Sequence, residues 1–298
     1  MSVSFMLQHR RNHINVKGNP MSFKTIFCVT DVNDNDDALA GAIRLCEQTN
    51  SHLSVMVIAV TPAPAIYAYG SVPDHGWATD YAAGTAKVKQ RGDAVEKQLQ
   101  KADISGDVCT SYIDFSHVDD MIGERASYAD VTLIGTTAGN EGELRDKTIY
   151  GALFHSNKPL LISPASGIQS FDVKKVMIAW DSGLPASAAV NHALWQMKNA
   201  EEVNIVMVDP VASAAVNGGE PGADMAQYLA RHGLNINVTQ LASGGQSVAE
   251  ALKQHAIDMN ADLIVMGGYG HSHLRQMIFG GVTSDFLKDT NIPVLMAH

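Results

Sequence analysis

Apolar runs alternate with amphipathic segments along most of the chain, and this alternation predicts its secondary structure. Four apolar runs in the first half, typical of buried strands, are matched in the same order by four runs in the second half. The paired runs are residues 23–31 and 173–181, 55–60 and 203–208, 129–135 and 261–267, and 158–162 and 292–296. Because four strands share their order, we interpret the chain as one folding unit written twice.

Segments with helical spacing separate these strands. Residues 88–102 and 248–259 each carry apolar side chains on one helical face and polar ones elsewhere. Strands that alternate with helices predict an α/β fold, in which a parallel sheet with right-handed crossovers is covered by helices on both faces. Residues 62–84 are rich in Gly, Pro and polar side chains, and we expect them to form a long loop.

A short stretch at residues 163–172 contains Pro, Ser and Gly and is the expected boundary between the two units. We therefore expect a first repeat over residues 22–165 and a second over residues 172–298, packed closely together because the linker is brief. Residues 1–21 are polar and locally basic, and we expect a disordered leader or an over-extended reading frame there. A targeting segment is the alternative, although no long hydrophobic stretch of a signal peptide is present.

Composition narrows the classes of partner. The net charge of -10 argues against non-specific nucleic-acid binding, because a phosphate backbone selects basic surfaces. No apolar run approaches the roughly 20 residues of a membrane-spanning helix, so no membrane partner is expected. Cys28, Cys46 and Cys109 are dispersed and odd in number, which predicts buried free thiols and a cytoplasmic location.

A glycine-rich stretch after the apolar run 261–266 is the most informative motif. Gly267 and Gly270 precede Gly280 and Gly281, and residues 282–288 then have helical spacing. A strand, a loop with bare backbone amides and a helix start together form a suitable site for a phosphate group. An ordinary surface loop is the alternative interpretation of these glycines.

At these residues the chain resembles the universal stress protein family in its tandem form, over roughly residues 22–298. Gly267, Gly270 and Gly280 match the glycine spacing of the family, whereas Gly281 stands where the family usually has Ser or Thr. The resemblance implies two repeats of a five-stranded parallel sheet in the order 3-2-1-4-5, an adenine nucleotide alpha hydrolase-like fold. It also implies that the two repeats pair as a dimer of single repeats does, and that the protein has a stress-response or regulatory role.

The resemblance further implies an adenine-nucleotide site in the second repeat. Asp181 would lie near the adenine or ribose, Ala179 against the nucleoside and Val208 at the base edge. The positions expected near the ribose and phosphates are Met266, Gly267, Gly270, Gly280, Gly281, Val282 and Thr283. ATP is the expected ligand and Mg²⁺ can accompany it, while AMP or ADP stays open because Gly281 lacks a hydroxyl. Thr283 or Ser284 could replace that hydroxyl, and a helix N-cap is the alternative role for Asp181.

The corresponding loop of the first half looks degenerate. Gly135 is present, but Ala138 occupies the second glycine position. The loop expected over residues 139–148 carries acidic side chains, which repel phosphates and are only partly offset by Arg145 and Lys147. We therefore expect the first half to be a structural partner, with Asp31 as a helix cap.

No arrangement of residues at informative spacing predicts an enzyme. The chain has no Walker-type Gly-Lys-Ser/Thr and no Ser-His-Asp arrangement at such spacing. His271 and His273 lack a third ligand at a fixed spacing, so we expect a solvated loop and no metal site. Binding without catalysis is the expected function, with a protein partner or homodimer left open. The alternatives are an interaction protein that binds no nucleotide, or a slow ATP hydrolase that uses Asp181 and Mg²⁺.

Overall fold

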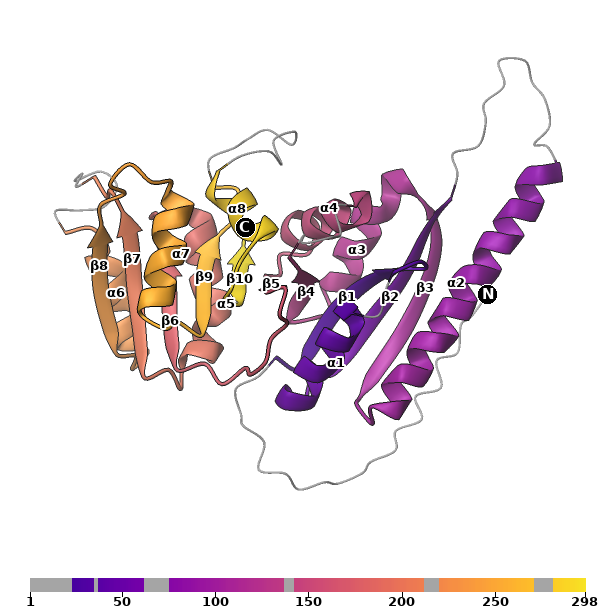
Figure 1. The fold of residues 1–298 in the computed structure, drawn as a ribbon, viewed down its shortest axis with the longest axis horizontal. Coiled ribbons are helices and arrows are strands. Elements are labelled where there is room, and N and C mark those ends of the chain that lie inside the picture. Colours follow the sequence, from indigo (N-terminus) through magenta and orange to yellow (C-terminus); the bar gives the residue numbers. More distant parts are fainter. Residues whose placement is uncertain (1–22, 35–36, 62–74, 137–141, 212–219, 271–280) are drawn as a thin grey trace, which may run out of the picture.

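One ten-stranded sheet runs through both halves of the protein (Figure 1). The computed structural model describes residues 23–34, 37–61, 75–136, 142–211, 220–270 and 281–298. The expected leader over residues 1–21 lies outside these residues. The first half of the sheet contains β1 Thr25–Asp31, β2 His52–Thr61, β3 Gly106–Asp114, β4 Val131–Gly135 and β5 Leu160–Ser163. The second half contains β6 Lys175–Ala179, β7 Glu202–Val208, β8 Ile236–Leu241, β9 Leu263–Gly267 and β10 Val294–Ala297.

The strand order is β3-β2-β1-β4-β5-β10-β9-β6-β7-β8. Each half therefore has the order 3-2-1-4-5 in its own numbering, and all pairs within a half are parallel. The halves join where β5 and β10 pair antiparallel, with Leu161 opposite Leu295. The expected α/β fold class and the order of strands are confirmed.

Helices cover both faces of this sheet. In the first half they are α1 Asp37–Thr49, α2 His75–Lys101, the short η1 Phe115–His117, α3 Val118–Ala126, α4 Glu143–Tyr150 and the π-helix η2 Gly151–His155. In the second half they are α5 Leu184–Met197, α6 Ala223–Arg231, α7 Val248–Asp258 and α8 Val282–Lys288. No helix in the described ranges combines the length and apolar character that a membrane crossing requires.

The hydrophobic core is continuous across the junction of β5 and β10. On one face a cluster packs against α1, α2, α5 and α6 and includes Leu161 and Leu295. On the other face a cluster packs against α4, η2, α7 and α8 and includes Ile162 and Met296. Neighbouring residues of a strand point to opposite faces, so the joined strands contribute to both clusters. Burial of these apolar side chains holds the two halves together as well as each half itself.

Two strands and two helix starts differ from the sequence-based expectation. The edge strands β3 and β8 are partly exposed along their length, so they contain no continuous apolar run. α2 begins at His75, and the predicted loop over residues 62–84 is wrong from that residue onward. α4 begins at Glu143, and the loop predicted over residues 139–148 is wrong from there. The start of α4 carries charged side chains, and no side chain over residues 79–87 of α2 is buried, so neither helix start shows an apolar face in the sequence.

All three cysteines are free thiols, as predicted. Cys28 in β1 and Cys46 in α1 are buried, whereas Cys109 in β3 is half-buried. Burial, reinforced by the charge of Asp34, raises the pKa of Cys28 to about 12. Burial also raises the pKa of Cys46 to about 12, with smaller contributions from Cys28 and Glu47. These thiols belong to the core of the first half and remain protonated at neutral pH.

Candidate functional site

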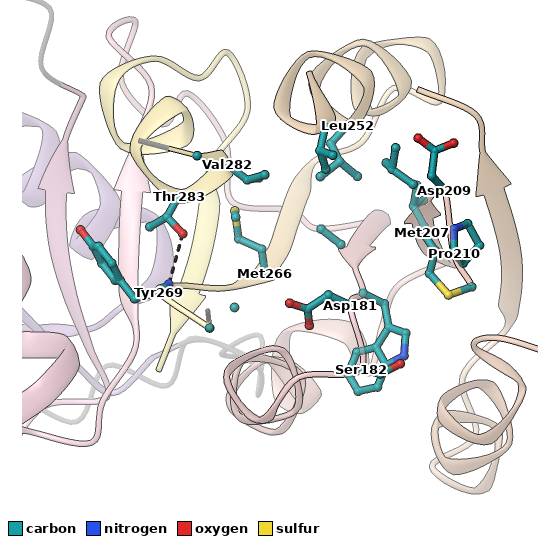
Figure 2. A pocket seen from close by; sticks show the side chains of 18 of the residues that line it. Asp181, Ser182, Met207, Asp209, Pro210, Leu252, Met266, Tyr269, Val282 and Thr283 are labelled. Atoms are coloured by element: carbon teal, nitrogen blue, oxygen red, sulfur yellow. Dashed lines mark hydrogen bonds between the residues drawn. The ribbon is translucent and has the colours of Figure 1, made fainter. Parts of the chain in front are cut away.

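A cavity of about 730 Å³ lies in the second half at the carboxyl ends of β6, β7 and β9 (Figure 2). The first turns of α7 and α8 complete its wall. Strand order reverses between β6 and β9, which is where a parallel α/β sheet leaves a crevice for a ligand. Nine of the residues predicted for the site line this cavity: Ala179, Asp181, Val208, Met266, Gly267, Gly270, Gly281, Val282 and Thr283. The tenth, Gly280, lies outside the described residues, as do His271 and His273.

Asp181 lies two residues beyond the end of β6 and contributes a carboxylate to the cavity wall. Its Oδ1 accepts a hydrogen bond from the Gly183 N–H at 2.8 Å. Figure 2 shows the carboxylate directed toward residues 267–270, which we call the glycine segment. The alternative role as a helix N-cap is wrong, because α5 begins at Leu184 with Gly183 at its N-cap. The side chain instead fixes the turn between β6 and α5.

The glycine segment packs closely against the start of α5. A Cβ added to Gly267 would lie 2.5 Å from the Ala186 nitrogen and 2.8 Å from the Pro185 carbonyl carbon. Neither backbone atom can move away easily, so only glycine fits at this position. The protein backbone alone therefore requires glycine at position 267. A Cβ at Gly270 would meet Asp181 Oδ2 at 3.7 Å, an ordinary contact.

Gly281 is the N-cap of α8 and has φ +87° and ψ -179°, a conformation that favours glycine. A Cβ added there would meet no atom of the described residues within 4 Å. The backbone conformation, rather than a close contact with these residues, favours glycine at this position. Of the two residues expected to compensate, Ser284 is buried and does not line the cavity, whereas Thr283 does. The Oγ1 of Thr283 accepts the Tyr269 N–H at 3.2 Å, and its hydroxyl hydrogen can still be donated.

Several lining residues were not identified from the sequence. They are Trp180, Ser182, Val206, Met207, Asp209, Pro210, Val211, Val248, Leu252 and Tyr269. Asp209 directly follows β7 with φ +46°, and its Oδ1 accepts the Ser243 N–H at 3.2 Å. Hydrogen bonds from Ser243 hold the pKa of Asp209 below its usual range. An aspartate followed by proline at a strand end was the available signal, because that dipeptide is typical of a turn.

The electrostatics of the cavity are acidic. Asp181 and Asp209 are its two carboxylates, and no lysine or arginine is among the lining residues that the structure describes. Within the described ranges, no group of three His, Cys, Asp or Glu side chains is placed to hold a metal ion. Apolar side chains such as Val208, Leu252 and Met266 complete the walls. This combination suits a flat apolar group with hydroxyls near a carboxylate.

The equivalent end of β4 in the first half is occupied by a side chain. Arg145 of α4 donates from Nη2 to the Gly135 carbonyl oxygen at 3.0 Å and to the Leu287 carbonyl oxygen of α8 at 2.7 Å. Lys147 is paired with Asp119 at 2.8 Å. Both cations, which were expected to offset acidic charge in a loop, instead make structural contacts. Ala138 lies outside the described residues.

Asp31 in the first half has the same local geometry as Asp181. Its Oδ1 accepts the Asn33 N–H at 2.8 Å, again two residues further along the chain. α1 begins at Asp37, so the predicted role of Asp31 as a helix cap is wrong. Asp31 ends β1 and Asp181 lies two residues beyond β6; each forms a turn, and only Asp181 borders the described cavity.

Comparison with known proteins finds a family model that matches the second half. Residues 172–298 match the family model described as the universal stress protein family. The chain is 28% identical over 144 residues to the universal stress protein Slr1230 of Synechocystis sp., and the match spans 46% of each protein. The chain thus spans about half the length of that curated relative.

The fold also resembles that of a solved protein over nearly its whole length. The crystal structure of a universal stress protein from Archaeoglobus fulgidus superposes with a TM-score of 0.66 at 17% sequence identity. The superposition covers 92% of this chain and 98% of that protein. At this level of identity the similarity establishes the arrangement of strands and helices.

Proposed function

We propose that this chain is a member of the universal stress protein family and that its second half, which matches the family model over residues 172–298, binds an adenine nucleotide. The proposed site is the cavity bordered by Asp181 and the glycine segment. We further propose that nucleotide binding serves a stress-response or regulatory role without requiring catalysis. A ligand that binds one conformer better than another shifts the population toward it, and this can signal to a partner.

The size and lining of the cavity support a nucleoside-sized ligand. Its volume of about 730 Å³ falls within the roughly 300–1,000 Å³ of small-molecule sites. Val208 and Leu252 offer apolar surface to a purine ring, while the strand ends at Ala179 and Val208 place backbone polar groups beside its edge. A purine needs this combination, because its faces are apolar and its edge carries hydrogen-bonding atoms.

Asp181 provides the means to recognise the sugar. Its Oδ1 is engaged with the Gly183 N–H, and a carboxylate has further lone pairs that can accept ribose hydroxyls. A hydrogen bond to a charged acceptor is typically worth about 1.5–3 kcal/mol. The position of this carboxylate between the end of β6 and the glycine segment is the single observation that best supports a nucleotide over a wholly apolar ligand.

The phosphates would lie toward Gly270, Gly281 and the first turn of α8. Exposed amides there suit an anion, and the absence of Cβ atoms at the two glycines leaves room for it. Because the described lining supplies no cation, a companion Mg²⁺ would reduce repulsion between a triphosphate and Asp181. We propose ATP as the ligand, with AMP or ADP as the alternative.

Mass spectrometry of the small molecules released from denatured, purified protein tests this proposal. We expect an adenylate in the released fraction, and saturable heat when ligand-free full-length protein is titrated with ATP, with and without Mg²⁺. Parallel titrations with ADP, AMP and GTP determine which phosphates and which base are recognised. Absence of any released adenylate, together with no heat up to millimolar ATP, ADP or AMP, would refute the proposal and favour a protein-interaction role.

A further inference from the structure

Aromatic side chains from both halves meet behind the glycine segment. The ring of Phe154, in η2 of the first half, lies 5.5 Å from the Tyr269 ring and 4.4 Å from the His298 ring of the second half. Tyr150 completes the group, with its ring 4.8 Å from that of Phe154. We call these four residues the junction cluster. Phe154 belongs to the first half, and its ring contacts both second-half members of the cluster, Tyr269 and His298.

Tyr269 links the junction cluster to the wall of the cavity. It stands between Gly268 and Gly270 with φ +61°, a left-handed conformation that is uncommon for a residue with a side chain. Figure 2 shows its ring directed away from the cavity, while its N–H donates to Thr283 Oγ1 across the cavity wall. Packing of the ring against Phe154 helps to hold a backbone conformation that would otherwise be disfavoured.

His298 forms a second link from Phe154 to the glycine segment. Its Nδ1 lies 3.0 Å from the Gly268 carbonyl oxygen, which can only accept, so Nδ1 carries the hydrogen. The Gly268 N–H in turn donates to the Ala297 carbonyl oxygen at 2.8 Å. Both polar groups of the Gly268 backbone are therefore held by Ala297 and His298, and the His298 ring packs at a tilt against Phe154.

Arg145 anchors the far end of the helix that borders the cavity. Its Nη2 donates to the Leu287 carbonyl oxygen near the end of α8, and its guanidinium also bonds the Gly135 carbonyl oxygen at the end of β4. A cation there complements the negative end of a helix. Because α8 spans only residues 282–288, fixing its end also constrains Thr283 in its first turn.

We propose that Phe154 and Arg145 of the first half are positioning residues for the cavity of the second half. Phe154 holds the glycine segment through Tyr269 and His298, and Arg145 holds α8 through Leu287. The first half thereby contributes to ligand affinity without contacting the ligand. The part of this inference that concerns ligand affinity rests on the proposed nucleotide function.

The first test replaces Phe154 by Ala in the full-length chain and measures ATP affinity by titration. We expect at least a fivefold loss, and a smaller loss for Phe154→Leu, which keeps apolar volume and tests the site if the alanine variant folds poorly. Tyr81→Ala is the matched control, because Tyr81 is a similarly exposed first-half aromatic (42% against 36% for Phe154) whose ring instead packs on Tyr112 at 5.2 Å. Equal affinity losses for Phe154→Ala and Tyr81→Ala would overturn the proposal.

The second test needs no nucleotide. Hydrogen–deuterium exchange of ligand-free protein should show faster exchange at residues 268–270 in Phe154→Ala, and at residues 282–288 in Arg145→Ala, than in the wild type or Tyr81→Ala. Unchanged exchange in both segments would overturn the positioning role, whatever the ligand. If wild-type protein binds no adenylate, the proposed function fails, while this exchange comparison still decides whether the first half orders the cavity wall.

Discussion

The two halves place different chemistry at the same point of the same strand order. At the end of β9, Gly267 and the residues after it leave the backbone open to a cavity; at the end of β4, the guanidinium of Arg145 bonds the Gly135 carbonyl oxygen. Arg145 also reaches the Leu287 carbonyl oxygen in the other half. The second half thus carries the candidate ligand site, and we propose that the first half supports it from outside. A half without a described cavity can still contribute to the site of the other half.

The largest expected contrast is between Gly267→Val and Gly135→Val. An added Cβ meets backbone atoms at 2.5 Å and 2.8 Å in the first case, and in the second it meets no atom of the described residues within 4 Å. We expect Gly267→Val to lower the free energy of unfolding by about 3 kcal/mol and to remove ATP binding, since overpacking displaces the start of α5. Gly135→Val should change stability by less than about 0.5 kcal/mol. Urea unfolding measures the stability of both variants, and titration measures their ATP affinity. Equal effects of the two substitutions would contradict the comparison.

The second contrast concerns stability at alkaline pH. Thiols lose their protons in this range, and every cysteine of the chain lies in the first half. The pKa of Cys28 is about 12 in the folded protein, against 9.0 for an ordinary thiol. Between these values the unfolded chain releases a proton that the folded chain keeps, so stability falls as pH rises, by about 1.4 kcal/mol per pH unit for each such thiol. Below pH 9 both states are protonated and this dependence disappears.

Cys28→Ala should reduce that slope by about 1.4 kcal/mol per pH unit, measured by urea unfolding between pH 8 and pH 10.5. The change in slope separates titration from the constant loss of packing caused by removing a buried sulfur. If the free energy of unfolding depends on pH in the same way in wild type and variant, the thiol of Cys28 is not protected by burial.

The third contrast compares Asp181→Ala with Asp31→Ala. Each substitution removes a 2.8 Å hydrogen bond from an N–H two residues along the chain, and Asp31→Ala also removes a 3.0 Å bond from Asn33 Nδ2, so both should weaken their turn. Only Asp181→Ala should weaken ATP binding, by about tenfold, because its carboxylate borders the cavity. Titration of both variants measures this difference, and an Asp181→Ala variant with wild-type affinity would remove the proposed ribose contact.

The smallest expected contrast lies at the helices before β4 and β9. Ser247 and Glu250 form reciprocal hydrogen bonds at the start of α7, whereas His117 at the start of α3 makes no side-chain cap bond. Ser247→Ala should lower the free energy of unfolding by about 1 kcal/mol, which is measured as a lower melting temperature. His117→Ala should leave the melting temperature nearly unchanged. A larger loss in His117→Ala would show that the α3 start depends on contacts other than capping.

The apolar pattern was sufficient to predict the buried strands but not the edges of the sheet. β1, β2, β4 and β5, with their second-half counterparts, contain apolar runs because helices cover both of their faces. β3 and β8 have a neighbour on one side only, and their mixed exposure leaves no run to recognise. Strand order came from the family resemblance, since local patterns do not determine which strands are neighbours.

The same limit applies to the candidate site. Glycines next to a strand and an aspartate at a strand end were recognisable because they follow one another closely in the chain. Arg145 was interpreted through its own loop, yet its partner Leu287 is 142 residues away and lies in the other half. Tyr269 stood inside the recognised motif but was passed over, because its left-handed backbone and its contact with Phe154 depend on how the halves join. Such long-range contacts are decided by packing, which short motifs do not encode.

The number of nucleotides bound per chain tests the central claim most directly. Equilibrium dialysis of full-length, ligand-free protein against labelled ATP, with and without Mg²⁺, gives this number without assuming where binding occurs. The account predicts saturation at one nucleotide per chain in wild type and Asp31→Ala, with affinity reduced about tenfold in Asp181→Ala. Two nucleotides per chain, or none at millimolar ATP, ADP or AMP, would contradict it.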